Sequence, residues 1–171
     1  TRRPVQNPLD RAFLAAGPQA GFTTTDDING QKQEGFGCFD TNIHDGERQR
    51  ASAAYLHPVI SRPNLSVRTK AHVNRVLFEH TRAVGVEFVS RRKTHEVRAN
   101  RAVILCAGAI QTPQLLMLSG VGDAKHLAEH DIPVIHDLPG VGQNLQDHLE
   151  IHLHYAAPAM AALNREMLPH R

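Results

Sequence analysis

Residues 104–120 read ILCAGAIQTPQLLMLSG, an apolar run that passes through small residues into a leucine-rich segment. The continuous apolar run over 102–106 is typical of a strand covered on both faces, as in a parallel sheet. Thr112 as a cap, Pro113 at the first helical position and Gly120 after the last turn predict a short helix. We therefore expect a buried parallel strand over 102–106, a loop over 107–111 and a helix that starts near Pro113.

The turn between this strand and this helix consists of Ala107, Gly108 and Ala109. In open α/β sheets, ligands bind outside the carboxyl ends of the strands. Small side chains let a ligand approach the backbone, and a helix start offers free N–H groups to a polar or negative group. The same small residues could equally serve tight packing of the strand against the helix. This segment alone does not decide between the two interpretations.

Antiparallel strands are predicted before this unit. Short valine-rich segments at 65–68, 71–78, 83–89 and 96–99 are separated by turns and favour an antiparallel meander. The basic residues 91–93 fit a solvated hairpin turn between two of these strands. Nearer the amino terminus we expect a helix from Asn7 to Gly17, a loop with an Asx-type turn at Asp27, and about two helical turns ended by Pro58.

The composition is that of an ordinary globular protein, with 41% hydrophobic and 21% charged residues among 171. There is no long Lys/Arg block, so nucleic acid is not an expected partner. The two cysteines, Cys38 and Cys106, lie far apart, which favours a reducing compartment. No signal peptide or membrane span is apparent. The chain runs from Thr1 to Arg171 without a closing element, and we expect it to be an internal piece of a longer protein.

A histidine-rich segment, HLEIHLHY at 148–155, raises the alternative of metal binding. On a strand, its alternate residues His148, Glu150, His152 and His154 would share one face. The spacing of His152 and His154 is one that zinc can use, but no cysteine or distant ligand completes a set. We therefore expect no native metal site.

Several segments together resemble the glucose-methanol-choline (GMC) family of FAD-dependent oxidoreductases. Residues 108–122, GAIQTPQLLMLSGVG, resemble the second signature of the family, and LPGVGQNLQDH at 138–148 resembles a following loop. The segments QEGFG at 33–37, RASAAYL at 50–56 and RAVGVEF at 82–88 resemble the branch that oxidises choline. The resemblance extends to about Leu153, and we recognise no match to the family in residues 156–171.

The resemblance implies an α/β fold: part of a Rossmann-like FAD-binding domain with an antiparallel meander, plus pieces of an α+β substrate domain. Residues 1–62 would be a helical and loop segment that links the two domains. Residues 63–145 would belong to the FAD-binding domain. Residues 146–171 would hold the start of the substrate-domain sheet and an unmatched tail.

The resemblance also implies which residues bind FAD. Val73 matches a position whose backbone polar groups contact the adenine, and Ala107, Gly108 and Ala109 match small residues that line the same cofactor. Without the family, Val73 would be interpreted as an ordinary core residue of the meander. The family's GxGxxG motif for the pyrophosphate is absent from this sequence.

The activity implied is oxidation of choline or a related primary alcohol to the aldehyde, with hydride transfer to flavin, as in glycine betaine biosynthesis. We assign no catalytic residue, because the family's catalytic histidine belongs to a region beyond this sequence, and we expect the chain alone to be inactive. The resemblance leaves the electron acceptor open. It implies either a mitochondrial location or peripheral membrane association in bacteria. The alternatives are a non-catalytic interaction piece and a histidine-rich metal-binding domain.

Overall fold

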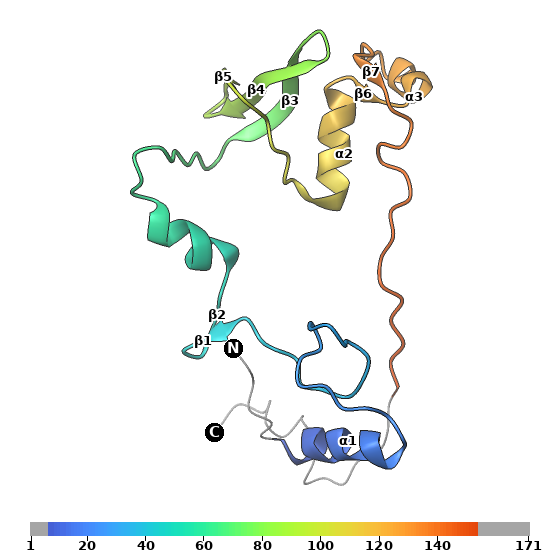
Figure 1. Ribbon diagram of the computed structural model, residues 1–171. Coiled ribbons are helices and arrows are strands. Elements are labelled where there is room, and N and C mark those ends of the chain that lie inside the picture. Colours follow the sequence, from blue (N-terminus) through green and yellow to red (C-terminus); the bar gives the residue numbers. More distant parts are fainter. Residues whose placement is uncertain (1–6, 154–171) are drawn as a thin grey trace, which may run out of the picture. The chain divides into compact units, whose positions relative to one another are not determined.

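A computed structural model describes residues 7–153 of the chain (Figure 1). These residues fall into two compact units, one built from the chain up to Ser66 together with residues from Ile151 onward, the other from Val67–Glu150. The assignment of chain segments to the domains of a longer protein remains a prediction.

The first unit begins with helix α1, Pro8–Gln19. Asn7 caps it, since its Oδ1 accepts a hydrogen bond from the Leu9 N–H at 2.8 Å, and Pro8 occupies the first turn where no N–H is needed. The predicted first helix is thus confirmed and runs slightly further than Gly17. In the loop that follows, the Asn29 N–H donates to Asp27 Oδ1 at 2.9 Å, which is the expected Asx-type turn.

The rest of the first unit contains little regular structure. Strands β1 (Ile43–His44) and β2 (Glu47–Arg48) pair antiparallel, and two irregular helical turns follow, η1 (Ser52–Leu56) and η2 (His57–Val59). The predicted helical turns are therefore confirmed, as a π turn followed by a 3-10 turn, but Pro58 does not end them. Pro58 lies within η2 rather than after it, at a position where its missing N–H costs no hydrogen bond.

The second unit contains the predicted antiparallel meander. Strands β3 (His72–Glu79), β4 (Arg82–Ser90) and β5 (Lys93–Arg98) lie in the order β3-β4-β5. Ser90 pairs with Lys93, so Arg91 and Arg92, with φ of 51° and 63°, form the two-residue hairpin turn. The segment 65–68 was also predicted as a strand, and it is irregular instead.

The predicted buried strand at 102–106 is wrong. The segment has no regular structure, and Ile104 is 82% exposed. A parallel strand covered on both faces needs hydrogen-bonded neighbours and covering helices. None of the described strands pairs with this segment, which runs from the end of β5 to the next helix (Figure 1).

Helix α2, Gly108–Leu118, begins earlier than predicted, so the expected loop at 107–111 forms its first turn. Ala107 is the N-cap, and the Ala107 N–H donates to Thr112 Oγ1 at 3.1 Å. Thr112 therefore supports the helix start from inside the helix rather than as its cap. Pro113 is also internal, where it removes one intrahelical hydrogen bond.

The end of α2 is as predicted, with Gly120 directly after the last turn. Gly120 has a φ of +84°, and a Cβ added to it would lie 2.5 Å from the Pro133 carbonyl oxygen. Beyond it, strands β6 (Val121–Gly122) and β7 (His136–Asp137) pair in parallel around the short helix α3 (Ala124–Glu129). Leu127 of α3, only 1% exposed, is the most completely buried side chain among the described residues.

Candidate functional site

A groove of about 770 Å³ lies within the second unit. Its walls are the start of β3, the facing parts of β4 and β5, the irregular segment 102–107 and one side of α2. Most of the lining is apolar and includes Val86, Val97, Leu105, Leu115 and Leu118. An apolar groove with a few polar groups is typical of a small-molecule or cofactor site.

The structure brings two of the four predicted cofactor residues into this groove. Val73 at the start of β3 and Ala107 at the start of α2 both line it. Gly108 and Ala109 do not line the groove, but they follow Ala107 directly as the first residues of α2. The meander and the small-residue turn, which are separate in sequence, thus meet at one site.

Gly108 has room beside it. Its φ is +87°, a conformation that L side chains rarely adopt, and an added Cβ would meet no atom within 4 Å. The open space means that this glycine is not required for packing within the described chain. A ligand could therefore approach the backbone at this turn, so the residues present fit a bound cofactor here.

Val73 lies on an edge of the sheet. β3 pairs with β4 on one side and with no other strand of the described residues, so part of its backbone is left for other partners. A register shift between Val73 and Arg75 marks a bulge at Asn74, and Val73 itself is 37% exposed. Bulges commonly redirect a strand next to a binding site. The interpretation of Val73 as an ordinary core residue is therefore not supported.

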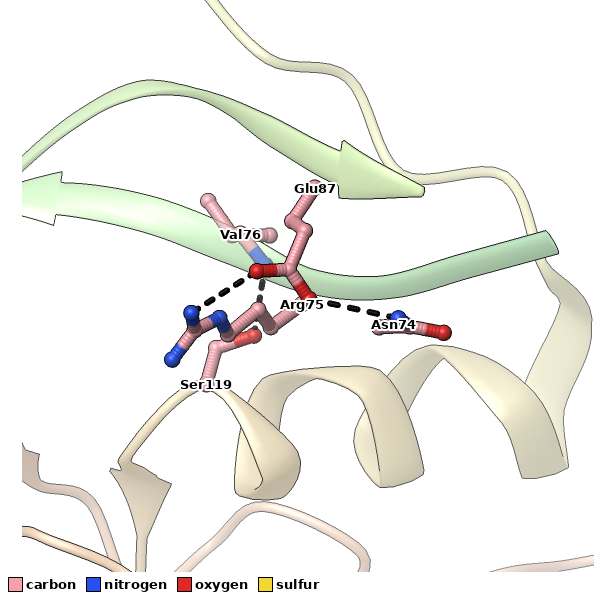
Figure 2. A network of polar contacts seen from close by, with 5 residues as sticks. All are labelled: Asn74, Arg75, Val76, Glu87 and Ser119. Atoms are coloured by element: carbon pink, nitrogen blue, oxygen red, sulfur yellow. Dashed lines mark hydrogen bonds and ion pairs between the residues drawn. The ribbon is translucent and has the colours of Figure 1, made fainter. Parts of the chain in front are cut away.

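A polar network fixes β3 to its neighbours (Figure 2). Arg75 Nη2 donates to Glu87 Oε2 at 2.8 Å, and Asn74 Nδ2 donates to Glu87 Oε1 at 3.2 Å. These two hydrogen bonds hold the pKa of the Glu87 carboxyl below its usual value, and the hydrogen bond from Arg75 has the larger effect. The network cross-links β3 to β4 just beyond Val73.

The sequence did not predict three polar side chains that line the groove, namely His72, Gln111 and Gln114. Gln111 and Gln114 stand three residues apart on α2 and so share one face of the helix. That spacing could have revealed them had the helix been predicted to start at Gly108 rather than near Pro113.

The histidine-rich segment does not form the predicted strand in its described part, since residues 148–153 have no regular structure. Within 7–153, no group of three or more His, Cys, Asp or Glu side chains is placed to hold a metal ion. His154 lies outside the described residues, and the expectation of no native metal site remains a prediction. None of the helices described is long and apolar enough to cross a membrane.

Comparison with known proteins shows which family this chain is similar to. A family profile described as GMC oxidoreductase matches residues 1–150. The mitochondrial choline dehydrogenase of Mus musculus is 52% identical over 171 residues, which is 100% of this chain and 29% of the relative. The oxygen-dependent choline dehydrogenase of Escherichia coli O157:H7 (strain EC4115 / EHEC) is 52% identical over 158 residues, covering 91% of this chain and 28% of the relative.

A solved structure of an FAD-dependent enzyme is also similar to this chain. An FAD-dependent oxidoreductase from Chaetomium thermophilum has a TM-score of 0.69 and 34% identity, covering 82% of this chain and 25% of that one. The chain spans less than a third of the length of the curated relatives it matches. The matches confirm the predicted resemblance, the fold class and FAD as the cofactor of the family. The chain belongs to the GMC oxidoreductase family.

Proposed function

We propose that the chain is part of an FAD-dependent dehydrogenase that oxidises choline or a related primary alcohol to the aldehyde. The observation that carries the proposal is the 52% identity to a choline dehydrogenase over all 171 residues. The proposal includes hydride transfer from the alcohol to the flavin. The whole protein would act in mitochondria or in bacteria, since its relatives include a mitochondrial and a bacterial enzyme. In bacteria we expect it to associate with a membrane.

The groove and the adjoining first turn of α2 are the proposed FAD-binding part of this chain, with Val73 and Ala107 in the groove and Gly108 and Ala109 beside it. FAD supplies the hydride acceptor when it is bound. The apolar walls at Val86 and Leu115 would exclude water from a planar ring. The edge of β3 at Val73 would offer backbone polar groups, which could form hydrogen bonds with the edge of the adenine ring.

No residue of this chain is assigned to the proton transfer from the alcohol. The general base of the reaction is expected in another part of the whole protein. The described chain would therefore contribute binding and orientation of the cofactor, while the chain by itself would be inactive.

The test is the flavin absorbance that remains with the protein after gel filtration. We expect the whole protein to retain flavin and oxidise choline, and the isolated 171-residue chain to do neither. In the whole protein, Gly108→Val should weaken FAD binding about fivefold to a hundredfold, because a branched side chain at a positive φ would occupy the open space beside the backbone. The control is Gly140→Val, which also meets open space but has no positive φ.

Two outcomes would contradict the proposal. One is a short chain that keeps a full complement of flavin and turns over choline. The other is a whole protein that neither binds flavin nor oxidises any primary alcohol.

A further inference from the structure

Ser119 lies at the end of α2 and is 7% exposed. Its hydroxyl has two partners in the described structure. The hydroxyl accepts a hydrogen bond from the Val76 N–H at 2.8 Å (Figure 2) and donates one to the Leu115 carbonyl oxygen at 2.5 Å. Because one hydroxyl is acceptor and donor at once, the three groups form a continuous hydrogen-bonded chain.

The two partners of Ser119 belong to two elements that each contribute lining residues to the groove, α2 and β3. Leu115 lines it from α2. Val76 lies on β3, the strand whose first residues, His72 and Val73, also line it. The side chain of Ser119 is itself outside the lining, so its hydroxyl joins the two elements without entering the groove.

The Val76 N–H donates to the Ser119 hydroxyl in place of the carbonyl group that a further strand would offer. β3 is an edge strand, and the Val76 N–H is buried, with the residue only 5% exposed. A buried N–H without a partner is destabilising, so β3 favours the position at which the Ser119 hydroxyl can reach it. The Ser119 hydroxyl thereby contributes to the distance between strand and helix.

We propose that Ser119 is a positioning residue of the FAD site, which holds β3 and α2 at the separation that the cofactor requires. The proposal rests on the proposed function, because it takes the groove as part of the FAD site. Ser119 acts through the backbone of Val76 and Leu115 and touches no reacting atom.

The experiment uses the whole protein and measures the FAD dissociation constant by titrating apoprotein, with urea unfolding of the same samples. Ser119→Ala removes the hydroxyl and should weaken FAD binding at least about fivefold and at most about a hundredfold, the upper limit being reached if the whole cost of the unpaired Val76 N–H falls on FAD binding. Ser119→Thr keeps a hydroxyl and should bind FAD more tightly than the alanine variant. Faster hydrogen exchange at the Val76 amide in Ser119→Ala would report the lost bond directly.

Leu127→Ala separates positioning from general stability. Leu127 is buried in α3 and does not line the groove. Its truncation should lower stability at least as much as Ser119→Ala, yet change FAD affinity by no more than about twofold, as for independent sites. The proposal is overturned if Ser119→Ala binds FAD like the wild type, or if Leu127→Ala weakens FAD binding equally. A wild-type protein that binds no FAD would instead contradict the proposed function itself.

Discussion

Two segments of the second unit that are rich in apolar residues, β4 and residues 102–106, have opposite surroundings. β4 is paired on both sides, and its Phe88 is 4% exposed. The segment 102–106 has no paired neighbour among the described strands, and its Ile104 is 82% exposed. An apolar sequence thus shows that a segment can be buried, but burial requires a partner within reach.

The largest expected effect contrasts these two segments directly. Phe88→Ala should lower the free energy of unfolding of the chain by about 3–5 kcal/mol, because it empties a buried site between two paired strands. Ile104→Ala should change it by less than about 0.5 kcal/mol, since an exposed side chain loses no packing. Urea unfolding followed by circular dichroism gives both values. Equal effects of the two substitutions would contradict the assignment of Ile104 to an exposed segment.

A second prediction extends the contrast to two glycines that follow apolar segments. Gly120→Ala should cost about 1–3 kcal/mol, because φ is +84° and the new Cβ would meet the Pro133 carbonyl oxygen. Gly140→Ala meets nothing within 4 Å and should be close to neutral. Thermal unfolding of the two variants side by side provides the check. A destabilised Gly140→Ala with an unaffected Gly120→Ala would mean that the turn after α2 is wrongly described.

The smallest effect concerns the polar link between β3 and β4. Hydrogen bonds from Arg75 and Asn74 lower the pKa of Glu87 from 4.5, so the folded state favours the carboxylate. The resulting stabilisation is complete above about pH 4.5 and is lost as the pH falls through the lowered pKa of the folded state.

Glu87→Gln cannot titrate and tests this dependence. The stability advantage of the wild type over the variant should be constant near neutral pH and should shrink in acid below about pH 4.5. Urea unfolding at a series of pH values measures the difference, with the exposed Glu47→Gln as the control. An advantage that grows on acidification would contradict the sign of the pKa shift.

The sequence predicted the local features of the fold better than the long-range ones. Valine-rich segments located β3 and β4, and the start of the first helix at Asn7 and the glycine after α2 were also predicted, because each depends on neighbouring residues. The start of α2 was misplaced, because Thr112 and Pro113 resemble a helix start while they lie inside the helix. The prediction of a strand at 102–106 failed because a parallel strand needs a hydrogen-bonded neighbour, and no described strand pairs with this segment.

The candidate site could be predicted only in part. Val73 and Ala107 were named from the family resemblance, and the structure brings them to one groove. The resemblance gave no reason to choose Gln111 and Gln114, whose placement depends on where α2 begins. The hydrogen bond between Ser119 and Val76 could not be predicted either, because it joins residues 43 positions apart.

Hydrogen exchange of the whole protein with and without FAD tests most directly whether the groove takes the cofactor. On FAD binding, we expect slower exchange in β3 around Val73 and in the turn from Ala107 to Gln111. The hairpin turn at Arg91 and Arg92, which lies outside the groove, should exchange at an unchanged rate. Flavin bound at full occupancy without protection at Val73 and Ala107 would contradict the account.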